Sequence, residues 1–167
     1  MQVHKGMRFR QVDVVLDGRL RDEWHDVIDV VAEYDLVLAS GHLTCGEAMI
    51  LFREAKLRGV QRLLFTHPVL PFLNWDAAVA DELGSLGVHL ELSILPDILV
   101  DGRGPVSHDL VDVYPDELLV FGGDMGHADH PTLPEVLPGW VGELASRAGD
   151  RAAESIMTTN GRQLVVA

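Results

Sequence analysis

The sequence predicts an α/β fold built from parallel βα repeats. Short apolar runs recur along its 167 residues, and each is followed by a stretch with helical periodicity; three of these runs are residues 35–40, 62–66 and 118–121. Strands that alternate with helices favour a parallel sheet with right-handed crossovers. No linker or low-complexity segment interrupts the pattern, and the length suits one substantial core, so we expect a single domain over residues 1–167.

The first third of the chain is expected to form two strands and two helices. Residues 12–16 are predicted to be a strand that ends at the Asp17-Gly18 turn. Residues 22–33 repeat apolar side chains at the spacing of one buried helical stripe. The strand at residues 35–40 leads to a helix at residues 44–58, and Gly59 stands where a glycine commonly ends a helix.

The rest of the chain continues the alternation. A strand at residues 62–66 runs into His67-Pro68, and Asn74 is expected to cap a helix that ends at Gly87. The elements expected after it are a strand at 89–95, a loop at 96–105, a short helix at 107–113, a strand at 118–121 and two helices at 134–148 and 150–159.

The strand at residues 89–95 bears on which kind of parallel sheet this is. His89, Glu91 and Ser93 fall on one face, and apolar residues fall on the other. The central strands of an open doubly wound sheet are apolar on both faces, whereas a barrel strand can present polar residues inward. The pattern favours a half or partial (β/α)8 barrel, the TIM type, because five strands cannot close a barrel of eight.

Composition excludes several classes of partner and site. With 13 basic and 26 acidic side chains the net charge is −13, which would repel nucleic-acid backbones and anionic membrane surfaces. Cys45 is the only cysteine, so neither an intramolecular disulfide nor a Cys-rich zinc cluster can form. No segment has the pattern of a signal peptide or the roughly 18 apolar residues of a membrane span, so a cytoplasmic location is expected.

Polar residues follow three predicted strands at the point where each strand ends: His42, His67 and Asp124. Parallel strands have their carboxyl ends on one side of the sheet, so these residues should converge on one rim. Two imidazoles and a carboxylate have the composition of a metal site. Each has a simpler interpretation as well: His42 as a loop residue, His67 as part of a rigid turn before Pro68, and Asp124 as a turn-forming Asp.

These residues stand in motifs that resemble the later part of amidohydrolase-like metal-dependent hydrolases. The motifs occur in order from about Val12 to the carboxyl terminus: Leu38-Ala39-Ser40-Gly41-His42-Leu43 followed by Glu47, Thr66-His67-Pro68, Gly122-Gly123-Asp124-Met125-Gly126 and Thr159-Asn160-Gly161-Arg162. The resemblance implies a (β/α)8 barrel with divalent metal at its rim, Zn²⁺ first and Mn²⁺ or Fe²⁺ as alternatives. It makes His42 and His67 ligands, Asp124 a ligand and catalytic base, and Asn160 structural.

The chain also departs from that family. The His-x-His pair of the family's first strand is absent, and about four strands of the first barrel half have no counterpart. A half-barrel leaves two open sheet edges and an uncovered inner face. We therefore expect a homodimer or a complementing half-barrel chain as partner.

Three further residues are candidates for substrate binding: Glu91, His127 and Glu47. Glu47 lies three residues after Thr44, which is also the spacing of a helix capping box. Glu91 shares a strand face with His89, and a buried carboxylate needs a partner, so pairing between these two is the simpler interpretation. His127 follows Asp124 in a loop that could equally be exposed.

Two hypotheses of function follow. In the first, the protein is a metal-dependent hydrolase of a small molecule, and a metal-activated water attacks an amide, lactone or ester-like bond with Asp124 as base. In the second, it is a catalytically inactive half-barrel that acts as a binding or assembly subunit. An open doubly wound ligand-binding domain has less support, because the sequence contains no Gly-x-Gly-x-x-Gly or phosphate loop.

Overall fold

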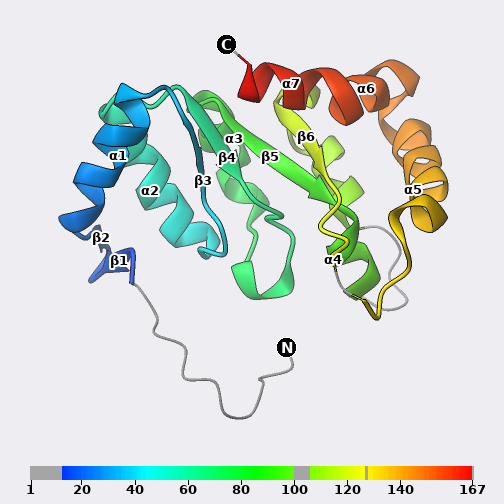
Figure 1. The fold of residues 1–167 in the computed structure, drawn as a ribbon, viewed down its shortest axis with the longest axis horizontal. Coiled ribbons are helices and arrows are strands. Elements are labelled where there is room, and N and C mark those ends of the chain that lie inside the picture. The colour runs from blue at the N-terminus through cyan, green and yellow to red at the C-terminus, as the bar shows by residue number, and fades with distance from the viewer. Residues whose placement is uncertain (1–12, 100–105, 127, 167) are drawn as a thin grey trace.

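A four-stranded parallel sheet forms the centre of the molecule, as the alternation of strands and helices predicted. The computed structural model describes residues 13–99, 106–126 and 128–166. The strands follow one another in sequence order across the sheet, β3-β4-β5-β6 (Figure 1): β3 is Val37–Ala39, β4 Arg62–Phe65, β5 Val88–Ser93 and β6 Leu119–Gly122. The strands β3 and β6 are therefore the two edges of this sheet.

Helices connect these strands and continue beyond the last one. The longer ones flank the sheet, with α1 and α2 beside β3 and α5 beyond β6 (Figure 1). Their bounds are α1 Glu23–Glu33, α2 Cys45–Leu57, α3 Ala80–Ser85, α4 Ile94–Leu99, α5 Leu133–Ala148, α6 Asp150–Glu154 and α7 Asn160–Val165. Short 3-10 turns lie at Pro71–Leu73, Ala77–Val79, Ser107–Asp112 and Asp116–Leu118, and a π turn, η5, at Ser155–Thr159.

The two faces of the sheet are buried unequally. In parallel pairing, residues in register share a face, and Leu38, Leu63 and Val88 form one such fully or nearly buried row. The neighbouring row of Ala39, Leu64 and His89 is exposed or half-buried and faces the other way. Right-handed crossovers between strands in consecutive order put all the connecting helices on one side, which explains why one face forms the main core.

The amino-terminal region differs from the expectation. Instead of a strand over residues 12–16 that joins the main sheet, a separate antiparallel hairpin forms from β1, Val15–Leu16, and β2, Arg19–Leu20. Residue 12 lies outside the described residues. The Asp17-Gly18 turn has φ values of 50° and 74°, the positive φ pair of a tight hairpin turn. The second strand has only two residues, too few for a pattern of alternation to reveal it.

The region around Pro96 was also predicted wrongly. The strand was expected to reach Leu95 with a loop after it, but β5 ends at Ser93 and α4 begins at Ile94. Pro96 lies in the first turn of this helix, where its missing N–H has no intrahelical acceptor to lose. Likewise Asn74 does not cap a helix: it adopts a left-handed conformation with φ 54°, and Asp76 accepts a hydrogen bond from the Ala78 N–H instead.

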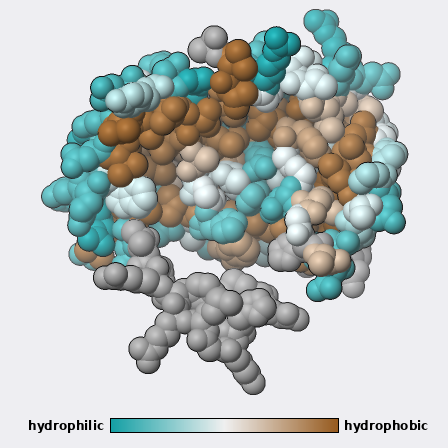
Figure 2. Space-filling view, in the orientation of Figure 1, coloured by the Kyte–Doolittle hydropathy of each residue, from teal (hydrophilic) through white to brown (hydrophobic). Residues whose placement is uncertain are grey.

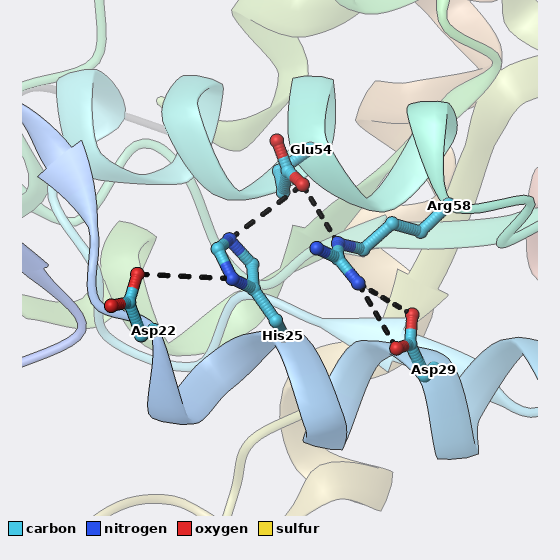
Figure 3. A network of polar contacts seen from close by, with 5 residues as sticks. All are labelled: Asp22, His25, Asp29, Glu54 and Arg58. Atoms are coloured by element: carbon cyan, nitrogen blue, oxygen red, sulfur yellow. Dashed lines mark hydrogen bonds and ion pairs between the residues drawn. The ribbon is translucent and has the colours of Figure 1, made fainter.

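Ion pairs join α1 to α2 on the outside of the sheet (Figure 3). Arg58, which caps the carboxyl end of α2, donates to Asp29 of α1 at 2.8 Å and to Glu54 of α2 at 2.7 Å. His25 of α1 is partly exposed, and its Nε2 lies 3.6 Å from Oε1 of Glu54. The network holds α1 against α2, together with the buried side chain of Ile28.

The carboxyl-terminal helices are tied to β6 by Asn160. Its side-chain amide donates to the carbonyl oxygens of Asp116 and Leu119, both at 2.7 Å. These two bonds satisfy a buried amide and fix the start of α7 against the sheet. None of the helices in the described residues is both long and apolar enough to cross a membrane.

His108 is a titratable side chain buried in the core. Its ring is 2% exposed, lies 4.4 Å from the ring of Trp140, and has a buried Nε2 with no hydrogen-bond partner. Burial, together with the charge of Arg147, lowers the pKa of His108 to about 4, although Asp109 acts in the opposite direction.

We predict that this histidine makes the fold sensitive to mild acid. A depressed folded-state pKa means that the unfolded chain binds the proton first, so stability is lost as the pH falls from about 6.5 towards 4. The loss attributable to His108 should approach about 3 kcal/mol. Urea unfolding at several pH values measures it, and His108→Phe should flatten that part of the profile. An unchanged profile in the variant would contradict the prediction.

Candidate functional site

The predicted convergence at the rim is observed for His67 and Asp124, and it includes Glu91 of β5. The Nδ1 atom of His67 lies 3.1 Å from Oε2 of Glu91 and 4.0 Å from Oδ2 of Asp124. The ring of His42 lies 5.4 Å from the ring of His67, centre to centre. Four neighbouring strands thus each contribute one titratable side chain at or near their carboxyl ends.

His67 is the centre of this cluster and is 7% exposed. It lies two residues after the end of β4 and has φ 31°, a left-handed conformation that is costly for a residue with a side chain. Its backbone N–H donates to Oε2 of Glu91 at 3.1 Å, the same oxygen that faces the ring. One carboxylate therefore holds both the backbone and the imidazole of His67 in place.

The environment of His67 favours its protonated form. Burial on its own would lower the pKa of the ring, but the hydrogen bond to Glu91 and the charges of Glu91 and Asp124 outweigh burial and raise it. With Nδ1 directed at Glu91, Nε2 is the nitrogen left to bind a proton, a metal ion or a substrate. This is the arrangement of a carboxylate-oriented histidine, found in metal sites and in general bases.

Gly122 leaves the space in which Glu91 lies. Ser93 and Gly122 are paired in register on β5 and β6. A Cβ atom built on Gly122 would overlap Oε1 of Glu91 and lie 2.9 Å from its Cγ. Any larger residue at position 122 would therefore force the Glu91 side chain to move.

Asp124 and His42 stand at the edges of the cluster. Asp124 has φ 49°, which Asp tolerates better than most residues, and its side chain is 39% exposed. His42 follows Gly41, whose φ of 56° turns the chain after β3, and the His42 ring packs edge-on against Phe72. Both side chains are less constrained than that of His67.

A serine links the ends of β3 and β4 beneath these residues. The Ser40 hydroxyl accepts a hydrogen bond from the Thr66 N–H at 3.1 Å and donates to the Gly41 carbonyl. Thr66 Oγ1 is buried without a hydrogen-bond partner. The position of His42 relative to His67 therefore rests on a bond between adjacent strands.

The other sequence-predicted residues are placed differently. Glu47 forms the capping box with Thr44 at the start of α2, and its carboxylate accepts from the Thr44 N–H at 2.9 Å. Glu91 contacts His67 rather than His89, whose Nδ1 is buried without a partner. His127 lies outside the described residues.

Sequence reasoning missed two contributors, Ser93 and Gly122. The Ser93 hydroxyl lies 3.5 Å from Nδ1 of His67. Ser93 shares the polar strand face with Glu91, and Gly122 opens the Gly-Gly-Asp run, so both stood beside recognised candidates. The sequence pattern alone does not give the register between β5 and β6, which places Gly122 beside Glu91.

The donor atoms suit a divalent ion in type, but they are not arranged around a common point. Within the described residues, no group of three or more His, Cys, Asp or Glu side chains is placed to hold a metal ion. The 3.1 Å and 4.0 Å separations of Glu91 and Asp124 are measured from Nδ1 of His67, whereas an ion would bind the other ring nitrogen, Nε2.

Comparison of the sequence with protein-family models gives a match. The model of DUF6282, a family of unknown function, matches residues 2–91, more than half of the chain, and the chain belongs to that family. The matched region includes His42, His67 and Glu91, whereas Asp124 lies beyond it. Comparisons with curated proteins and with solved structures gave no significant match.

We predict that Gly122→Ala lowers the pKa of His67. The added methyl group displaces Glu91, and the buried ring then loses the carboxylate that favours its protonated form while burial remains. Histidine chemical shifts followed by NMR against pH measure this change. Gly123→Ala is the matched control, because a Cβ atom there meets no atom nearer than 3.6 Å. Equal titration of His67 in both variants would show that Glu91 does not set its pKa.

Proposed function

We propose that this protein is a metal-dependent hydrolase of the amidohydrolase type that acts on an amide, lactone or ester-like bond of a small molecule. The observation that carries the proposal is the anchored imidazole at the rim: His67 is nine-tenths buried, is oriented by Glu91 through Nδ1, and lies near Asp124 and His42. Histidines that bind metal ions commonly donate their second ring N–H to a carboxylate in this way.

The residues that would hold the ion are His42, His67 through Nε2, and Asp124. Zn²⁺ suits two imidazoles and a carboxylate best, and Mn²⁺ or Fe²⁺ are alternatives. When bound, such an ion lowers the pKa of a bound water to about 7 and polarises the bond to be cleaved.

The chain's own side chains would divide the remaining work. Of the two carboxylates at the rim, Asp124 is more exposed than Glu91. Asp124 would accept the proton of the water and pass it to the leaving group. Glu91 would keep the His67 ring in one orientation and tautomer. Phe72, half exposed beside His42, offers an apolar surface for part of a substrate.

A partial (β/α)8 barrel is the fold that accompanies this proposal. Support comes from the consecutive order of the four parallel strands, the one-sided burial of the sheet and the polar residues His89 and Glu91 on the less buried face. In barrels of this kind the catalytic residues lie at the carboxyl ends of the strands.

The alternative proposal is a binding or assembly subunit without catalytic activity. It is favoured by the open edges of β3 and β6 and by the absence, within the described residues, of a preformed group of metal ligands. Open edges can pair with a second copy or with a complementing half-barrel chain.

Metal binding tests the hydrolase proposal directly. Isothermal titration with Zn²⁺ and Mn²⁺ should give about one equivalent per chain, and His67→Ala should abolish it. Glu91→Gln should weaken binding by about 10–100-fold, the usual effect of removing a carboxylate that orients a ligand. His25→Ala, on the α1 surface, is the matched histidine control and should bind like the parent.

Activity and mass complete this test. The loaded protein should hydrolyse members of an ester, lactone and amide panel, and Asp124→Asn should lose turnover more than metal affinity. Failure to bind either ion, or equal binding by parent and His67→Ala, would overturn the hydrolase proposal. A stable metal-free oligomer by light scattering would then favour the assembly role.

A further inference from the structure

A carboxylate on α4, the helix that follows the carboxyl end of β5, joins three elements of the fold. Asp97 accepts one hydrogen bond at each oxygen: the Ser107 N–H donates to Oδ1 at 2.8 Å, and Nε1 of Trp140 donates to Oδ2 at 2.7 Å. Ser107 is the first residue of the 3-10 turn Ser107–Asp112, and Trp140 lies on α5. Asp97 therefore ties α4 both to this turn and to α5.

The next contact leads from Ser107 to the rim. The Ser107 hydroxyl donates to the Ser93 carbonyl at 2.6 Å, and Ser93 is the last residue of β5. The Ser93 hydroxyl lies 3.5 Å from Nδ1 of His67. Glu91, two residues earlier on the same strand, contacts both the ring and the backbone of His67. Whatever fixes the end of β5 thus also fixes the two β5 side chains that contact His67.

Most of this network is internal, in contrast to the exposed apolar surface over α1 and β3 that Figure 2 shows. Ser93 and Ser107 are fully buried, and Trp140 is 6% exposed. The indole ring of Trp140 packs against the rings of His108, at 4.4 Å, and Phe121, at 5.2 Å. These contacts orient the indole, and its buried N–H then requires an acceptor.

The position of Asp97 requires a carboxylate. Two N–H donors, one from the Ser107 backbone and one from Trp140, converge on it, and an ionised carboxylate accepts at both oxygens. Burial raises the pKa of Asp97, and the hydrogen bonds from Ser107 and Trp140 act in the opposite direction. An amide has one oxygen and one NH2 group, so Asp97→Asn would set a donor against one of the two N–H groups.

We propose that Asp97 and Ser107 are positioning residues that hold the end of β5, and with it the side chains that orient the His67 ring. The proposal rests on the proposed function for the chemistry that His67 performs. The hold on His67 itself can be tested without a metal ion.

Tyr114 provides a matched comparison on the same strand. Its hydroxyl donates to the Val88 carbonyl at 2.5 Å, at the amino end of β5 and away from the rim. Tyr114→Phe and Ser107→Ala each remove one buried bond between a hydroxyl and a β5 carbonyl. If these bonds only stabilise the strand, both variants should affect His67 alike, whereas positioning predicts an effect from Ser107→Ala alone.

Hydrogen exchange of the His67 backbone amide, which donates to a carboxylate of β5, tests the proposal in the metal-free full chain. The amide should exchange at least about tenfold faster in Ser107→Ala than in the parent, and close to the parent rate in Tyr114→Phe. The Leu63 and Leu90 amides of the middle strands should stay protected in both variants, which would show that the sheet remains folded. Parent-like exchange of His67 in Ser107→Ala, or equal acceleration in both variants, would overturn the proposal.

A double variant tests Asp97, and it decides the question if Ser107→Ala does not fold. Asp97→Asn alone should speed exchange of the His67 amide, because one N–H donor loses its acceptor. In a Trp140→Phe background it should have little further effect, since the remaining Ser107 N–H can donate to the Asn oxygen. Equal acceleration in both backgrounds would contradict the role of Asp97.

Metal affinity separates this proposal from the proposed function. If the parent binds Zn²⁺, Ser107→Ala should bind it at least about tenfold more weakly, and Tyr114→Phe should bind it like the parent. Equal affinity in all three proteins would count against positioning. If the parent binds no ion, the hydrolase proposal fails, and exchange of the His67 amide still decides whether Ser107 positions that residue.

Discussion

The contact between Glu91 and His67 is the constraint on which the rim of this molecule depends. A single carboxylate oxygen lies 3.1 Å from both the backbone nitrogen and the ring Nδ1 of His67. The backbone bond stabilises a left-handed conformation that His67 would otherwise avoid, and the contact with the ring fixes the direction of Nε2. The contact is possible because Gly122, on the neighbouring strand, has no side chain. Three strands must therefore be in register before the imidazole is placed.

This dependence explains why some of the site could be predicted from the sequence and some could not. His67 and Asp124 meet because parallel strands end on one side, and that rule needs only the order of strands and helices. The partner of Glu91 needs more. The nearest candidate along its own strand face was His89, but the observed partner, His67, lies just after the adjacent strand β4, and the choice between them is made by inter-strand register. Pattern in one chain carries little information about register.

The errors in the fold have local causes of the same kind. The β1–β2 hairpin is too short for alternation to be visible, and the start of α4 is hidden by Pro96, which usually signals a loop but is tolerated in a first helical turn. By contrast, α2 was predicted well because it has both its capping box at Thr44 and its terminal glycine at Gly59, whose φ is 91°. Start and stop signals were not sufficient everywhere, because Asn74 and Gly87 were interpreted in the same way and enclose only the short helix α3.

The charge balance at the rim connects the proposed metal site to proton binding. Glu91 and Asp124 both lie near Nδ1 of His67, and they favour a positive charge on that ring because they raise its pKa although burial acts in the opposite direction. A protonated imidazole supplies that charge when no ion is bound. Because a metal ligand must be a neutral imidazole, an ion arriving at His67 has to displace the proton. The carboxylates that would attract the ion thus also favour the proton that competes with it for His67. Metal affinity at the proposed site should therefore fall as the pH decreases through the pKa of His67.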